Sequence, residues 1–237
     1  MTIPDTIFSV PEAVRNHHRN TTNSFARSGT WLTGEIRRNL VIETRNAPSC
    51  GLCSRKKEAL SPASVRGEHD LLGDLPPSLI ELVHKLQNDS GRITSSWVRE
   101  ILDMGMTDEE YVEASGTIST SIVIDTYAYG LGLALEEIPP AEDQSPSMDR
   151  LRKVTEDGAF FPITDTGPEE SGGGGLNRTP NIVRAMGLVP SAVEEFFGVM
   201  AHHYGLPGGS FRENTTLQRP QVELIAAKVS AINECFY

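Results

Sequence analysis

Apolar residues recur every three to four positions along much of the chain, which is the pattern of amphipathic helices. The first clear case covers residues 32–46, where Leu32, Ile36, Leu40 and Val41 share one face. The same spacing predicts further helices over residues 78–87, 95–104, 191–204 and 217–234. The sequence therefore predicts an all-α protein.

The longest predicted helix begins at Thr107 and extends to about Leu131. Thr107 is a good N-cap, and the three acidic residues after it suit the positive end of the helix dipole. Residues 117–126 are rich in Val, Ile and Thr and could be misread as a strand, but the length of the segment favours a buried helix. Asp125 lies in this apolar segment. A buried carboxylate needs a partner, so Asp125 is either a hydrogen-bonded structural residue, which we favour, or a pocket residue.

Two groups of residues each occur twice along the chain, in the same order. Val10-Pro11-Glu12-Ala13-Val14 recurs as Val189-Pro190-Ser191-Ala192-Val193, and Leu32, Leu40 and Cys50 recur as Leu217, Ile225 and Cys235. Proline and glycine interrupt the helical pattern between these copies, notably at 172–175. We therefore predict a first helical repeat over 1–137, an irregular connector over 138–180 and a second repeat over 181–237.

Composition and charge exclude several classes of protein. The formal net charge is -11 and no basic block occurs, which argues against a nucleic-acid partner. No apolar run approaches the about 20 residues that cross a bilayer, so we expect no membrane association. The N-terminus lacks the basic and apolar regions of a secretory signal, and the 3 cysteines are too few for a secreted disulfide framework. These features predict a cytoplasmic protein.

Cys50-Gly51-Leu52-Cys53 is the clearest candidate for chemistry. At the start of a helix, two thiols at this spacing can cycle between dithiol and disulfide. Inert structural cysteines are the second interpretation. A metal site is the third, because zinc needs four ligands and His69 and His84 could supply two only by folding nearby. We expect His17-His18 and His202-His203 to be polar residues on helix surfaces.

The stretch from Leu32 to Pro62 reads as a helix followed by this CxxC, and residues 217–235 read as a second such helix that leads to Cys235. Together they resemble the alkylhydroperoxidase D-like / carboxymuconolactone decarboxylase family, in its two-repeat peroxidase-related branch. The signature of that family is a helix bearing a glutamate, then CxxC at the start of the next helix, then a histidine four residues later. The resemblance implies a fold of two alkylhydroperoxidase D-like helical repeats.

The positions of the family signature can be matched one by one to residues of this sequence. The resemblance implies that Glu223 is the proton-relay glutamate and that Cys235 is the resolving cysteine of the second repeat. The attacking residue would then be number 238, so we expect the second repeat to be incomplete, truncated at its active-site motif. A UGA codon meant as selenocysteine is one hypothesis for this truncation. In the first repeat, Arg38 occupies the place of the glutamate and Lys57 that of the histidine, which implies an atypical dithiol without the acid–base relay.

The function implied by the resemblance is that of a peroxidase-like thiol, or selenol, oxidoreductase. Its substrate would be a hydroperoxide and an external thiol would be its reductant, with no cofactor and no metal. One alternative is a carboxymuconolactone decarboxylase-like enzyme, whose chemistry would not need the dithiol. Another is a non-catalytic oligomerising protein, inactive because the nucleophile is missing. We also expect a homo-oligomer, because apolar residues of the last predicted helix need cover: Val222, Ile225, Val229 and Ile232.

Overall fold

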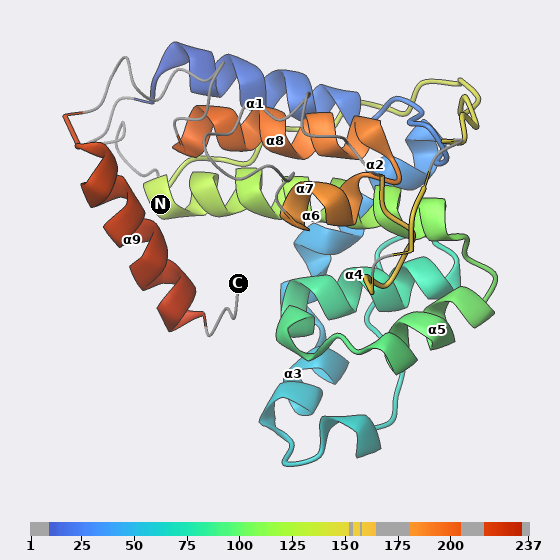
Figure 1. Cartoon of the computed structure of the whole chain (residues 1–237). Helices are drawn as coiled ribbons and strands as arrows, with labels where there is room; N and C mark the ends of the chain where they lie inside the picture. The colour runs from blue at the N-terminus through green and yellow to red at the C-terminus, as the bar shows by residue number, and fades with distance from the viewer. Residues whose placement is uncertain (1–9, 152–153, 157, 165–180, 205–215, 234–237) are drawn as a thin grey trace.

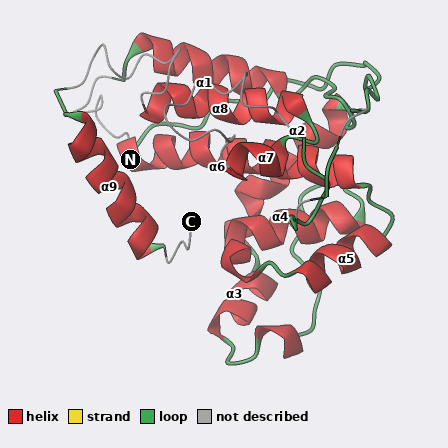
Figure 2. Ribbon diagram, in the orientation of Figure 1, coloured by secondary structure: helices red, strands yellow, loops and turns green. Residues whose placement is uncertain are grey.

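The computed structural model describes residues 10–151, 154–156, 158–164, 181–204 and 216–233. Within these ranges the regular structure is helical (Figures 1 and 2), and one isolated antiparallel bridge joins Thr155 to Ile163. The prediction of an all-α fold is confirmed. The α-helices are α1 (Glu12–Ser24), α2 (Gly34–Asn46), α3 (Gly51–Glu58), α4 (Pro77–Asp89), α5 (Ser95–Asp103), α6 (Asp108–Leu131), α7 (Asn181–Met186), α8 (Pro190–Tyr204) and α9 (Arg219–Ile232). Short 3-10 turns lie at Ala47–Ser49, Pro62–Ser64 and Ser90–Arg92.

Helix α6 is the central element of the bundle and confirms the long helix expected from the sequence. Thr107 and Glu110 form a capping box at its start, which satisfies two backbone N–H groups that a helix end leaves unpaired. Gly132 ends it with a left-handed φ of 67°. Asp125, inside the helix, accepts two hydrogen bonds from Arg45 at 2.8 and 3.0 Å. Asp125 therefore has the hydrogen-bond partner that its burial requires.

Helices α8, α2 and α4 pack directly against α6, and α1 packs on α8. Helices α1 and α8 lie along one side, and α2 and α4 contact the other, as Figure 1 shows. The core between them is apolar and fully enclosed, with Leu40, Leu82, Ile118 and Val189 all at 0 % exposure. On the α8 side, Gly116 of α6 lies so close that a Cβ placed on it would be 2.8 Å from the Cβ of Ala192. A glycine is required there because the two helix backbones approach closely.

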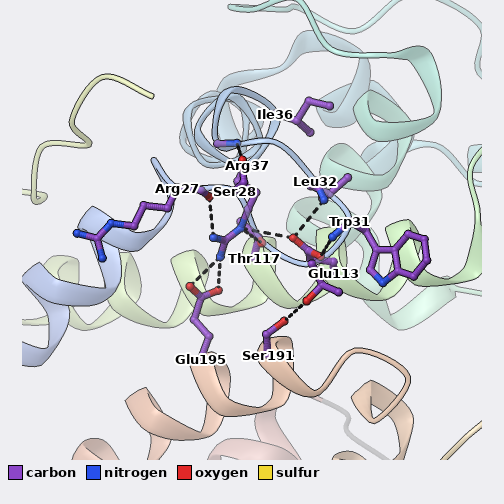
Figure 3. Close-up of polar contacts among 12 residues, drawn as sticks. Arg27, Ser28, Trp31, Leu32, Ile36, Arg37, Glu113, Thr117, Ser191 and Glu195 are labelled. Atoms are coloured by element: carbon purple, nitrogen blue, oxygen red, sulfur yellow. Dashed lines mark hydrogen bonds and ion pairs between the residues drawn. The ribbon is translucent and has the colours of Figure 1, made fainter. Parts of the chain in front are cut away.

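A buried ionic network fixes α8 to the remainder of the bundle (Figure 3). Arg37 of α2 donates to both carboxylate oxygens of Glu195 on α8, each at 2.8 Å. It also donates to the carbonyls of Ser24 and Arg27, at 2.9 and 3.0 Å. On its other side it lies 3.8 Å from Glu113 of α6. One arginine thus joins three helices that are far apart in the sequence.

A cluster of four histidines lies between α1 and α8, and we call it the histidine cluster: His17, His18, His202 and His203. His17 stacks on His202, and His18 Nε2 lies 2.5 Å from His203 Nε2. Tyr127 of α6 packs against His18 and His203. Burial, and then neighbouring histidines, lower the pKa of His18 and of His203 to about 4. The expectation of surface residues is wrong for His18, which is 6 % exposed.

The chain after α6 comprises the connector and helices α7, α8 and α9. Where it is described, the connector follows an irregular course, and its Phe161 packs on Tyr111 of α6. Gly172–Gly175 and Cys235 lie outside the described residues. On α9, Val222 is buried, whereas Ile225, Val229 and Ile232 are 54 %, 51 % and 68 % exposed. Among the described helices, none is both long and apolar enough to cross a membrane.

Candidate functional site

The CxxC motif lies where the sequence predicts it, at the start of a helix. Cys50 is the N-cap of α3, and its carbonyl accepts the hydrogen bond of Ser54 N at 3.0 Å. Asp70 Oδ2 accepts a hydrogen bond from Gly51 N at 2.7 Å, which places a carboxylate at the positive end of this helix. Both cysteines are free thiols, with Cys50 at 1 % and Cys53 at 8 % exposure.

Two histidines from distant parts of the chain meet these sulfurs. His69 comes from the extended segment before α4, and its Nδ1 lies 3.4 Å from Cys50 Sγ and 3.5 Å from Cys53 Sγ. His84 comes from the buried face of α4, and its Nδ1 lies 3.3 Å from Cys53 Sγ. The two imidazole rings stack with their centroids 3.9 Å apart. We call these side chains the four-donor cluster: Cys50, Cys53, His69 and His84.

A carboxylate stands behind each histidine of the cluster. Glu43 Oε1, on α2, lies 3.1 Å from His84 Nε2. Glu43 is 1 % exposed and also accepts hydrogen bonds from Asn46 and from Leu72 N. Glu81 Oε1 lies 3.3 Å from His69 Nε2, off the N–H axis, so this contact is an ion pair rather than an aligned hydrogen bond. Each imidazole therefore presents Nδ1 to sulfur and Nε2 to a carboxylate.

The electrostatics of the cluster separate the two histidines. Burial lowers the pKa of His69, but its contacts with both sulfurs and Glu81 outweigh this and raise it to about 10. Burial, followed by the charge of His69, lowers the pKa of His84. Burial raises the pKa of Cys50, yet the backbone N–H groups of Cys53 and Asp70, with His69, lower it to about 7. At neutral pH the cluster thus holds an imidazolium, a neutral imidazole and a thiol close to its point of ionisation.

An open cleft of about 690 Å³ leads to the cluster. Cys53, His69 and His84 line it, whereas Cys50 does not. Basic side chains gather at the same cleft, including Lys56, Lys57 and Arg66. A small substrate can therefore reach Cys53 from the cleft while Cys50 stays behind it.

The structure brings together only part of the expected site. Cys50 and Cys53 are joined by His69 and His84, which lie 16 and 31 positions beyond Cys53 and which the sequence suggested only as ligands of a metal site. Glu43 lies seven residues before Cys50 rather than the twelve of the family signature. The acid–base groups that do contact the dithiol, His84 and behind it Glu43, therefore stand at other positions than those of the family signature. His84, on the apolar face of the helix predicted over 78–87, is the sequence feature that could have indicated this contact.

Of the residues that the family signature identifies, Glu223 and Arg38 lie away from the sulfurs. Glu223 is on the exposed surface of α9, where it accepts a hydrogen bond from Tyr204 and pairs with Arg219 at 2.5 Å. Cys235, which the family signature places beside this glutamate, lies outside the described part of the chain. Arg38 donates to the carbonyl of Pro139 at 3.0 Å, away from the sulfurs. Lys57 does line the cleft beside Cys53.

Comparison with protein families, with curated proteins and with solved structures finds no match for this chain. The four-donor cluster must therefore be interpreted by its chemistry. Two thiols close together can form a disulfide, and a histidine backed by a carboxylate can move the protons. Two thiols with two imidazoles are also a ligand set for a metal ion.

Proposed function

We propose that the chain is a dithiol oxidoreductase of peroxidase type, which reduces hydroperoxides with Cys53 as the attacking thiol and Cys50 as the resolving thiol. One observation carries the assignment. Cys53 lines the cleft and contacts His84, which in turn contacts the buried Glu43. This is the arrangement of a nucleophile, a base and a group that orients the base.

The reaction follows from these positions. His84 takes the proton of Cys53, and the thiolate attacks the distal oxygen of the hydroperoxide. The O–O bond breaks, the alcohol leaves with a proton from His84, and Cys53 becomes a sulfenic acid. Cys50 then attacks that sulfur, so that an S–S bond forms, the S–O bond breaks and water leaves.

The resolving step needs little movement. The donor atoms of the four-donor cluster all lie within 4.8 Å of one another, and a disulfide requires about 2.05 Å between sulfurs. Rotation of the side chains at the start of α3 can close that gap. An external dithiol then returns two electrons and two protons by thiol–disulfide exchange. Free thiols persist in a reducing compartment, which favours a cytoplasmic location.

The resemblance to the alkylhydroperoxidase D-like family agrees with this chemistry, and it remains part of the proposal. In that family the second cysteine of the motif attacks, which corresponds to Cys53 here. The proposal differs in the source of the relay, because Glu43 and His84 replace the residues of the family signature. We also propose that the chain self-associates through exposed apolar residues of α9, which sedimentation at several concentrations tests.

The test is hydroperoxide consumption by reduced, metal-free protein with dithiothreitol as reductant. With dithiothreitol, turnover should be lost in Cys53→Ser. Without reductant, Cys50→Ser should still consume one equivalent of peroxide and give a sulfenic acid that dimedone traps, whereas Cys53→Ser should give none. Slow, unchanged consumption by all three proteins would refute the proposal.

Two further variants locate the chemistry. Cys235→Ser tests the alternative pair implied by the family signature, and turnover that depends on Cys235 but not on Cys53 would contradict our assignment. His84→Gln should slow sulfenic acid formation about 100-fold or more, because it removes the general base. His202→Gln is the matched control, since it changes a histidine of the histidine cluster, and it should leave the rate unchanged.

A further inference from the structure

The four-donor cluster has a composition and a geometry that a redox role alone does not require. Its donors are two cysteine sulfurs and two imidazole nitrogens, brought together from α3, the segment before α4, and α4 itself. Three of the four residues are buried and the fourth is half-buried. We propose that the reduced four-donor cluster binds one Zn²⁺ ion.

The distances agree with tetrahedral coordination. Zinc binds thiolate at about 2.3 Å and imidazole at about 2.0–2.1 Å, which puts a sulfur and a nitrogen ligand about 3.6 Å apart in a tetrahedron. Three of the four sulfur–nitrogen distances in the cluster are 3.4, 3.5 and 3.3 Å, and the fourth, between Cys50 and His84, is within 4.8 Å. The cluster thus approaches the spacing of a zinc site with its ligand atoms already turned inward.

The surroundings of the histidines support the same conclusion. A histidine that binds metal usually donates its other ring N–H to a carboxylate or carbonyl, which fixes the tautomer and raises the basicity of the ligand. Here Glu43 lies 3.1 Å from His84 Nε2 within hydrogen-bond geometry, and Glu81 lies 3.3 Å from His69 Nε2 as an ion pair. Two such carboxylates are more than one proton relay needs.

The donor types favour zinc over other ions. Two thiolates and two imidazoles suit a tetrahedral ion of intermediate softness, whereas magnesium and calcium prefer oxygen ligands. Two thiolates also neutralise the double charge of the ion inside the fold. The CxxC supplies its pair from the first turn of α3, and the histidines close the remaining two positions.

Zinc binding would regulate the proposed dithiol chemistry, and this one step rests on the proposed function, whereas binding itself does not. Zinc occupies the electron pairs with which the thiolates attack a hydroperoxide. Oxidation of the loaded site consumes one hydroperoxide and two protons, and it yields the Cys50–Cys53 disulfide, one alcohol, one water and free Zn²⁺. The disulfide removes two of four ligands, so the ion leaves.

The test of binding uses Co²⁺ as a spectroscopic probe in place of zinc. The reduced full chain, freed of metal by a chelator, should take up one equivalent of Co²⁺ and show the visible bands of a tetrahedral ion with sulfur charge transfer. Zn²⁺ should displace it at one equivalent. Cys50→Ser and His69→Gln should abolish this spectrum, with far-UV circular dichroism to verify that each variant is folded.

Two other variants make the test sharper. Glu81→Gln leaves all four ligands in place and should weaken zinc binding about 10- to 100-fold, because the carboxylate orients His69. His202→Gln should bind like the wild type. No stoichiometric uptake by the wild type, an octahedral cobalt spectrum, or equal loss in His202→Gln would each overturn the proposal.

The outcomes for zinc and for redox chemistry are separable. If the reduced chain takes up one equivalent of Co²⁺ but the metal-free chain forms no disulfide in hydroperoxide, the zinc site stands and the proposed function fails. If metal-free chain forms the Cys50–Cys53 disulfide but the reduced chain takes up no metal, the zinc site is overturned and the proposed function stands. Release of one equivalent of zinc with formation of the disulfide supports both.

Discussion

Removal of the Arg37 guanidinium should destabilise the fold more than any exposed charge change. Arg37 is 8 % exposed in its side chain, and its partners Glu113 and Glu195 are 3 % and 14 % exposed (Figure 3). Arg37→Met keeps an apolar stem but leaves two carboxylates without their cation. Breaking one side of a buried pair costs about 3–5 kcal/mol. That is a large part of the about 5–15 kcal/mol by which domains are stable.

The assay is urea unfolding followed by circular dichroism, together with thermal unfolding. For a chain of this size the expected loss corresponds to a fall in Tm of about 6–20 °C. Arg27→Met is the matched control, because its ion pair with Glu142 is 59 % and 55 % exposed and should be worth at most about 1 kcal/mol. The double variant Arg37→Met/Glu195→Gln should recover part of the loss. A loss below about 1 kcal/mol for Arg37→Met would refute the reasoning.

Three further predictions concern the cluster and the helix contacts. Glu43→Gln should lower the rate of sulfenic acid formation about 10- to 100-fold while circular dichroism shows a retained fold. The pKa values of His18 and His203 lie near 4, below the ordinary 6.5, so the folded chain binds fewer protons than the unfolded chain between these pH values. The Tm of the wild type should therefore fall as the pH drops from about 6.5 toward 4, and the Tm of His203→Gln should fall less. Gly116→Val should lower the stability by about 1–3 kcal/mol in urea unfolding, because its side chain would meet Ala192. An unchanged rate, a flat pH profile or an unchanged urea midpoint would contradict these three in turn.

Several helix positions were predictable because they depend on local pattern, although no helix was predicted over α1. The apolar spacing of residues 32–46 and the acidic start after Thr107 both specify helices that the structure contains. The packing partners of those helices were not predictable. The ion pair between Arg37 and Glu195 joins residues 158 positions apart, and no local pattern encodes that distance.

The candidate site was predictable only to the extent that it is local. Cys50 and Cys53 are separated by one helical turn, so their chemistry can be read from the sequence. His69, His84 and Glu43 reach them through the tertiary fold, and a search at the family spacing pointed to Arg38 and Lys57 instead. Spacing alone does not find groups of this kind, because proton transfer depends on their positions in space.

One measurement tests the central claim, that Cys50 and Cys53 form a single redox pair. The reduced, metal-free chain contains 3 cysteine thiols. After reaction with one equivalent of hydroperoxide, we expect one free thiol to remain. Peptide mass mapping should then find Cys50 and Cys53 joined in a disulfide and Cys235 free. Three remaining thiols, or a disulfide that includes Cys235, would contradict the account.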